Sequence, residues 1–326
     1  MKADETSKSE EKIRAYFDVL KDDKLVYSDY PALFKTIANH LQNDVFLMIQ
    51  GEPYIMGELE FYYKSKSHPD SFTHCDDMQK ESFTWYFHRT GNVYRSGTYK
   101  GLDITFATDD QTHAGILIRS IYPIIRKGHF APKITDGPSL SVDLILHKTG
   151  FSNIESFVKT AGRSVFDNTY LHLKLQEEVD LTDYVKVPEK YQVMPTGRVG
   201  LTLKRYFINA EYFLTGPYRF VRFPDKIKKG KPHMVLTMIA KNDSADKIKK
   251  DLSTTAASVE NIKKQYKIGK TLTSNETFKK DLSKDLLPQL FGYATTLKYK
   301  TADDKNKKEE EKEEPKEVEE EEEDDE

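Results

Sequence analysis

Apolar and polar residues repeat with two different periods along this chain of 326 residues, and together they predict an α+β fold. Apolar residues recur every three to four positions in 11–20 and 31–42, which predicts two helices. Strand-like runs rich in β-branched and aromatic residues follow, separated by turn-rich segments. These runs occupy 45–50, 54–63, 85–89, 93–107 and 115–124. Such a succession favours a curved, mostly antiparallel sheet flanked by helices.

The second half of the chain continues the same mixture of elements. A Gly-Pro turn opens a predicted helix over 137–150. The stretch after this helix is polar and loop-like, and the remaining elements are two strands followed by two helices. They are predicted at 197–203, 218–223, 257–270 and 279–299.

Nothing between residues 11 and 299 has the composition of a linker, so we predict one domain over 11–299. Segments 1–10 and 300–326 are predicted to be disordered. The net charge of -3 hides an asymmetry, because 309–326 contains 14 acidic residues and two lysines. The rest of the chain then has 48 basic and 39 acidic residues. A basic body suits a polyanionic partner such as DNA, although lysine-rich surfaces are often only solvated, and the acidic tail suggests a basic protein partner.

Several classes of protein are disfavoured by composition. Cys75 is the one cysteine, which rules out a disulfide framework and suits a reducing compartment. No apolar signal segment is visible, and no apolar run approaches the roughly 18 residues of a membrane span. We therefore expect an intracellular protein with no membrane partner. His68, His74, Cys75 and Asp76 are near in sequence, but their spacing matches no standard zinc site, so we predict no metal and no cofactor.

Charged residues within the apolar strand runs are the candidate chemistry. Glu58 and Glu60 are two apart in the motif GELEFYY, so a strand projects both to one face. The ordinary interpretation is a half-buried strand with a wet face, and the alternative is a catalytic carboxylate. Arg119, in GILIRSI, must pair with a carboxylate unless it reaches solvent at a strand end. Asp103 adds a charge in a third apolar run, and three such charges together indicate a site.

Six short motifs occur in the same order as in the alkyladenine (3-methyladenine) DNA glycosylase family, which the chain resembles over about residues 50–223. They are GELEFYY, THC, SGTYKGLDI, GILIRSIYP, GPSLSVDLIL, and GRVGL followed by GPYRFV. In that family an E-x-E-A-Y strand precedes a loop histidine, a YGxYxxxN strand, a VLLRAxEP strand, a GP-led helix and an RVG segment. The resemblance implies a 3-methyladenine DNA glycosylase-like fold. It also implies hydrolysis of the N-glycosidic bond of alkylated or deaminated purines in one step, with no lysine nucleophile, no strand cleavage and no metal.

Carried over position by position, the resemblance implies that Glu60 is the general base that activates water. Arg119 would hold that water and the carboxylate, assisted by His74 and by the backbone carbonyl of Val199. Glu58 would then be a supporting or structural partner.

The resemblance also implies how a flipped base is held. The base would lie between the rings of Tyr62 and His74. Asp103 stands where the family has an asparagine that discriminates among purines. The added negative charge favours a cationic or amino-bearing base.

Other positions depart from the family pattern. Ser96 stands where the family has a tyrosine that wedges into the gap left by the flipped nucleotide, so Tyr94 or Tyr99 would have to replace it. Phe61 stands where the family has a small alanine and would crowd the pocket. The loop that follows is longer, so His68 competes for the stacking role.

The leading hypothesis is a monomeric, monofunctional DNA glycosylase of the nucleus. One alternative is a non-catalytic nucleic-acid or chromatin-binding module on the same fold. Another is an N-glycoside hydrolase that acts on free nucleosides or nucleotides, which agrees with the missing wedge. Basic residues should line the mouth of the Glu60 pocket in an enzyme and lie elsewhere in a binding module.

Overall fold

The computed structural model describes residues 7–129, 133–185, 188–204, 207–280 and 282–298. The predicted acidic tail 300–326 and residues 1–6 lie outside the described residues. The disorder predicted for the remainder of 1–10 is wrong, because Ser7 caps a helix that begins at Lys8.

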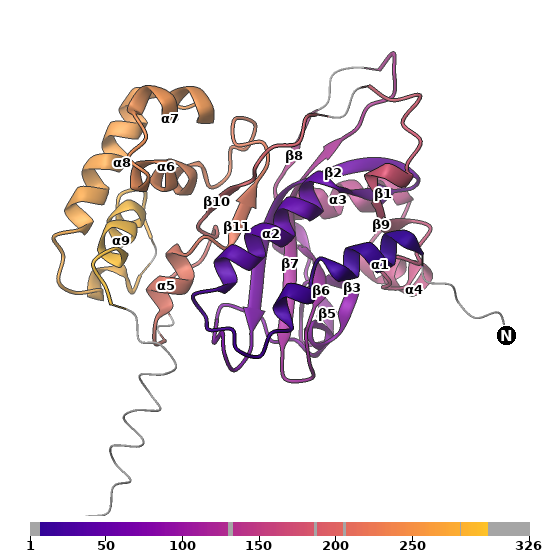
Figure 1. Cartoon of the computed structure of the whole chain (residues 1–326), viewed down its shortest axis with the longest axis horizontal. Coiled ribbons are helices and arrows are strands. Elements are labelled where there is room, and N and C mark those ends of the chain that lie inside the picture. Colours follow the sequence, from indigo (N-terminus) through magenta and orange to yellow (C-terminus); the bar gives the residue numbers. More distant parts are fainter. Residues whose placement is uncertain (1–6, 130–132, 186–187, 205–206, 281, 299–326) are drawn as a thin grey trace, which may run out of the picture.

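Helices and strands alternate irregularly along the described residues (Figure 1). The α-helices are α1 (Lys8–Ala15), α2 (Tyr30–Asn43), α3 (Pro138–Thr149), α4 (Ile154–Ala161), α5 (Ala210–Thr215), α6 (Lys231–Ala240), α7 (Ala245–Leu252), α8 (Ala256–Gly269) and α9 (Leu286–Ala294). The strands are β1 (Val45–Ile49), β2 (Glu52–Lys64), β3 (Ser82–Phe87), β4 (Arg89–Thr90), β5 (Val93–Tyr94), β6 (Leu102–Phe106), β7 (His113–Pro123), β8 (Thr135–Asp136), β9 (Leu171–Leu175), β10 (Met194–Thr196) and β11 (Arg219–Val221).

Across the described residues, nine of these strands form one sheet whose main path runs β10-β11-β2-β7-β6-β3. Strand β1 pairs with β2 and β9, β8 pairs with β7, and β4 and β5 form a separate hairpin. Each strand pairing described is antiparallel. The predicted α+β class, with a mostly antiparallel sheet flanked by helices, is confirmed.

Strand β2 is the centre of this sheet, and its two faces differ in chemistry. Leu59, Phe61 and Tyr63 point into the main apolar core, where α2 covers the sheet. The ring of Phe61 stacks on Phe34 of α2 with centroids 4.8 Å apart. Phe61 therefore lies on the face opposite Glu60, and the prediction that it crowds the pocket is wrong.

The C-terminal helices α5 to α9 gather at one end of the sheet, beyond β10 and β11 (Figure 1). They enclose a second apolar core with members such as Met234 and Leu290, and Val221 of β11 belongs to it as well. The sheet thus has one face covered by α2 and part of the other covered by the C-terminal helices. The glutamates of β2 belong to this second face.

Some predicted elements differ from the observed ones for local reasons. The strand predicted at 197–203 is irregular, and Gly200 has φ +88° there, which does not fit a strand. The long strand predicted at 93–107 is interrupted by a 3-10 turn over Gly97–Tyr99, where Gly97 has φ +56°. The helix predicted over 279–299 begins only at Leu286, with Pro288 in its first turn, where the missing N–H costs nothing.

Helices α8 and α9 cross at two glycines, and this contact should be sensitive to an added methyl group. A Cβ on Gly292 would lie 2.0 Å from the carbonyl oxygen of Tyr266, and one on Gly269 would lie 1.9 Å from that of Gln289. We expect Gly292→Ala to lower the free energy of unfolding by about 1–3 kcal/mol, because the helices must separate. Urea denaturation measures this, and Glu260→Ala on the exposed side of α8 is the control. Equal stability of both variants would contradict the close crossing.

Candidate functional site

Two buried guanidinium groups hold the first acid of the GELEFYY motif. Glu58 Oε1 accepts hydrogen bonds from Arg119 Nε at 2.7 Å and from Arg219 Nε at 2.5 Å. The three residues are at most 6% exposed. The pairing of β2 with β7 is irregular at this point, between Met56 and Leu59. Arg219 also donates to the carbonyl oxygens of Lys229 and Gly230, which ties the segment before α6 to the sheet.

The second acid, Glu60, accepts hydrogen bonds from three different donors. Its Oε1 accepts from the backbone N–H of Val199 at 2.8 Å. Its Oε2 accepts from Tyr62 Oη at 3.0 Å and from Arg119 Nη1 at 3.3 Å. Glu60 is fully buried. The carboxylate is therefore fixed in orientation by a backbone amide, a phenol and a cation.

Opposite charges in this cluster stabilise each other against the cost of burial. Two carboxylates face two guanidinium groups, so the cluster is formally neutral, as buried ion pairs must be to persist. Burial by itself lowers the pKa of Arg119, but the carboxylates of Glu60 and Glu58 outweigh burial and raise the pKa above its ordinary value. Burial, reinforced by the charge of Glu60, raises the pKa of Tyr62 far above its ordinary range. Arg119 thus stays charged, and Tyr62 stays a hydroxyl donor.

A second buried ion pair supports Tyr62 from the other side. Arg198 donates to both carboxylate oxygens of Asp70, at 2.6 and 3.2 Å, and both side chains are fully buried. The guanidinium carbon of Arg198 lies 4.6 Å from the centre of the Tyr62 ring. One face of Tyr62 is therefore occupied by a cation.

Asp103 belongs to a separate group of polar side chains that involves two histidines. Its Oδ1 lies 2.8 Å from Nε2 of His88, and Asp103 is 1% exposed. The ring of His74 meets the ring of His88 edge to face at 4.8 Å. Desolvation, and then the neighbouring His88, lower the pKa of His74 to about 4. His74 is therefore a neutral ring near pH 7.

The sheet connects the two groups through one row of residues. Residues that pair across strands share a face, and this row crosses six strands. Its members, all buried, are Thr196, Arg219, Glu60, Leu117, Asp103 and Tyr86. Only Leu117 is apolar, and it separates Glu60 from Asp103 by two strand spacings, about 10 Å.

Gly115 allows Asp103 to lean toward Tyr62. It pairs with Tyr62 in the register of β2 and β7. A Cβ on Gly115 would lie 2.5 Å from Asp103 Oδ2 and 3.0 Å from Gln79 Nε2. The space above Gly115 is thus filled by the side chains of Asp103 and Gln79, which a larger residue at this position would displace.

The predicted site residues fall into three groups in the structure. Glu60, Arg119, Tyr62 and Val199 converge, and Val199 donates its backbone N–H to the Glu60 carboxylate. Asp103 and His74 lie together with His88. Tyr99 is 75% exposed and belongs to neither group.

His68 does not compete for a stacking position. It is fully buried, with Nδ1 2.6 Å from the carbonyl oxygen of Tyr63 and Nε2 3.1 Å from Tyr218 Oη. A carbonyl can only accept, so Nδ1 carries the proton and Nε2 accepts from the phenol. His68 is therefore a hydrogen-bonded core residue, and its predicted stacking role is wrong.

Two members of the site were missed in the sequence. Arg219 lies in the apolar run YRFVRF, where the reasoning applied to Arg119 would have identified it. His88 lies at the end of the strand run WYFHR, and a polar ring there has no comparably strong signal.

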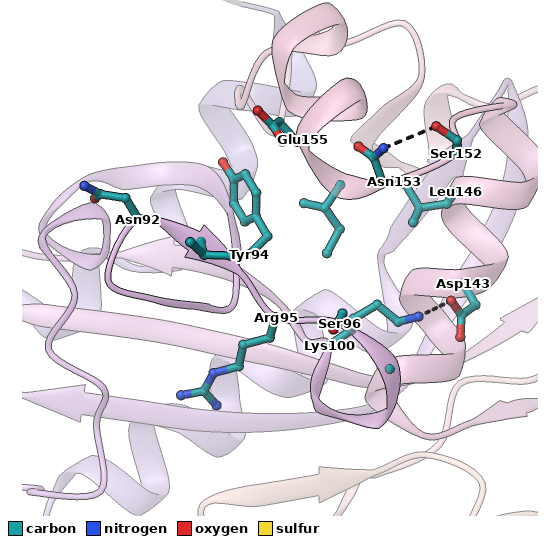
Figure 2. A pocket seen from close by; sticks show the side chains of 13 residues that line it. Asn92, Tyr94, Arg95, Ser96, Lys100, Asp143, Leu146, Ser152, Asn153 and Glu155 are labelled. Atoms are coloured by element: carbon teal, nitrogen blue, oxygen red, sulfur yellow. Dashed lines mark hydrogen bonds and ion pairs between the residues drawn. The ribbon is translucent and has the colours of Figure 1, made fainter.

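Two cavities among the described residues are lined by residues other than Glu60. The larger, about 510 Å³, lies between 92–97 and helices α3 and α4 (Figure 2). Lys100 reaches across it to Asp143 of α3, so its cation is already paired. The smaller, about 240 Å³, lies among α6, α7 and α8.

The described residues contain no group of three or more His, Cys, Asp and Glu side chains that could hold a metal ion. None of their helices is both long and apolar enough to cross a membrane.

Comparison with known proteins gives one informative relative. The chain is 32% identical over 225 residues to the uncharacterized protein L759 of Acanthamoeba polyphaga mimivirus. The alignment covers 64% of this chain and 95% of the viral protein. No family model matches the chain, and no solved structure matches it.

Two buried histidines should make stability depend on pH. Burial is the main cause that lowers the pKa of His68 to about 4. Burial, and then the nearby Arg219 and Arg119, lower the pKa of His233 to about 3. The unfolded chain binds these protons near pH 6.5, so stability falls as pH drops from about 6.5 toward 4, by about 1.4 kcal/mol per pH unit for each histidine.

We expect His233→Leu to remove one proton from this dependence. Urea unfolding at several pH values between about 6 and 4 should then give a slope lower by about 1.4 kcal/mol per unit than that of the wild type. His129→Gln, at an exposed position, should leave the slope unchanged. An unchanged slope in His233→Leu would show that His233 protonates equally in both states.

Proposed function

The chain belongs to the same family as the mimiviral protein L759, and from that premise we propose that it is a monofunctional DNA glycosylase with Glu60 as general base. The printed name of L759 specifies no activity, so the support comes from the site. The observation that carries the proposal is the set of three donors around Glu60. They hold one carboxylate in a fixed orientation, on the strand that also carries Tyr62.

The donors leave one oxygen of Glu60 available for water. Oε2 accepts from Tyr62 and Arg119, which uses both of its lone-pair sites, whereas Oε1 accepts only from Val199. A water on Oε1 donates one proton to Glu60 as its oxygen attacks C1′ of the deoxyribose. The bond from C1′ to the base nitrogen breaks, and its electron pair leaves with the base. A base that is cationic through alkylation leaves neutral and needs no added proton.

The second group of residues suits recognition of the base. The flat base would lie between the rings of Tyr62 and His74. Asp103 Oδ2 then accepts from an exocyclic amino group or attracts a cationic ring. The carboxylate, where the resemblance has an amide, favours positively charged purines such as alkylated adenine.

The wider expectations from the resemblance join this proposal. We propose a 3-methyladenine DNA glycosylase-like fold for the sheet part, DNA as the partner, a monomer, and a location in the nucleus. The antiparallel sheet with β2 at its centre supports the fold, because the six motifs fall on β2, β6, β7, α3, β11 and the loops between them.

A non-catalytic binding module is the second candidate, and two observations favour it. Glu60 is fully buried, and the arginines near it are already paired with carboxylates. The surplus of basic residues lies instead in the C-terminal helices, as expected for a module. In that case the Glu60 cluster serves stability alone.

Replacement of the proposed base separates the two candidates. We expect Glu60→Gln to lower the single-turnover rate of base release from an alkylated oligonucleotide by about 100-fold or more, because an amide cannot take the proton. Glu52→Gln, on the solvent-exposed Glu52–Arg126 pair at the other end of β2, should keep the wild-type rate. If the wild type releases no base from alkylated or deaminated DNA, whether single- or double-stranded, the result favours the binding module. If it hydrolyses only free nucleosides, the result favours the nucleoside hydrolase.

The exposed Tyr99 is the candidate wedge for duplex DNA. It is 75% exposed and two residues from Gly101, whose backbone packs against the ring of His88. We expect Tyr99→Ala to slow base release from duplex DNA roughly tenfold, because the gap left by the flipped base is no longer filled. Single-stranded substrate should be released at the wild-type rate, and Tyr191→Ala, exposed elsewhere, is the control. An equal loss on both substrates would contradict a wedge.

A further inference from the structure

We infer that one face of α8 binds the phosphate backbone of nucleic acid, at a surface separate from the Glu60 cluster. The surface is formed by Lys263, Lys267 and Lys270 and is called the α8 lysine face below. The inference rests on the proposed nucleic-acid partner but not on hydrolysis by Glu60.

The distribution of charge along the chain first points to the C-terminal helices. Residues 1–225 contain 28 basic and 30 acidic residues. Residues 226–280, which include α6, α7 and α8, contain 14 lysines and five acidic residues. The basic surplus of the body is therefore concentrated in about a sixth of the chain, in helices that the glycosylase resemblance does not cover.

The three lysines share one side of α8. They are spaced four and three residues apart, which places them on one face of a helix. All three line the smaller cavity, of about 240 Å³, together with Asn242 and Asp243. The adjacent side of α8 is fixed by buried residues such as Ile262, so the orientation of the helix is set by packing.

These lysines have no acidic partner among the described residues, in contrast to neighbouring ones. Asp243 at the cavity pairs with Lys247 at 3.0 Å, and Lys249 pairs with Asp246 at 3.2 Å. Lys270 lies over the ring of Tyr266 at 4.9 Å, which orients its ammonium group without neutralising it. The α8 lysine face is thus a line of charges that an external anion can neutralise.

The spacing of the line fits a polymer of phosphates. At 1.5 Å per residue, the three lysines span about 10.5 Å of helix axis. Phosphates rise by about 3.4 Å along one strand of DNA, so about three of them match this length. Lysine ammonium groups contact phosphates as point charges, which predicts binding without sequence preference.

Salt-dependent binding tests the inference. The probe is an undamaged duplex oligonucleotide, and the variant is full-length Lys263→Gln/Lys267→Gln/Lys270→Gln. Loss of three phosphate contacts should reduce the slope of log affinity against log salt by about 2.7. Between about 50 and 200 mM salt, the affinity of the wild type should therefore fall about 40-fold more than that of the variant.

Two controls keep the outcome specific. Lys8→Gln/Lys12→Gln/Lys21→Gln removes the same charge near α1, at the other side of the molecule (Figure 1), from lysines that have acidic partners. It should bind as the wild type does. Replacement of the three α8 lysines by arginine should retain binding, and thermal melting verifies that each variant is folded.

Three results would overturn the inference. One is an unchanged slope in the α8 variant, and another is an equal loss in the α1 variant. The third is unchanged DNA binding together with weaker binding of a peptide with the sequence of residues 309–326, which would assign the face to an acidic polypeptide. Base release is measured separately, so loss of DNA binding and loss of hydrolysis remain distinguishable.

Discussion

The buried neutral cluster of Glu58, Glu60, Arg119 and Arg219 is the interaction on which the rest of the structure depends. Charges at this depth persist only when each has its counter-charge in place, and here the counter-charges come from three different strands. Strand β2 must therefore lie between β7 and β11 in one register, since a shift by one residue would send its acids to the apolar face. The same requirement reaches the C-terminal helices, because Arg219 also needs the carbonyl oxygens before α6.

The buried charges also make the two faces of β2 chemically different. Toward α2, β2 presents only apolar side chains such as Phe61, which build the main core. On its other face, β2 carries Glu60 and Tyr62, and Tyr62 pairs with Gly115, above which Asp103 and Gln79 lie. The buried charges thus stand beside further polar side chains of the same face. The fixed orientation of the Glu60 carboxylate is compatible with its proposed role as a base. It is equally compatible with a purely structural role, in which it fixes the register of β2.

The sequence predicts those features of the fold and site that are set by residues close together in the chain, and it misses contacts between distant segments. The alternation in GELEFYY predicts which side chains of β2 share a face. The free-energy cost of burying an unpaired arginine predicts that Arg119 pairs with a carboxylate. The contact of Val199 through its N–H depends on a loop path that no pattern encodes, and the burial of His68 depends on Tyr218, 150 residues away. Helices α6 and α7 were not predicted, and their apolar faces pack on distant elements, with α6 against α8, α9 and β10. The catalytic roles carried over from the resemblance stay predictions.

The charge of the chain is divided between two regions, the sheet part and the C-terminal helices. The sheet part is close to neutral and pairs its buried Arg119, Arg198 and Arg219 with carboxylates, so it contributes little long-range attraction for a polyanion. The C-terminal helices carry the surplus and leave it unpaired on α8. The two regions are nevertheless joined at Arg219, which binds both Glu58 and the segment that leads into α6. A polyanion bound at the α8 lysine face would therefore be bound to helices whose position relative to Glu60 is fixed by the contacts of Arg219.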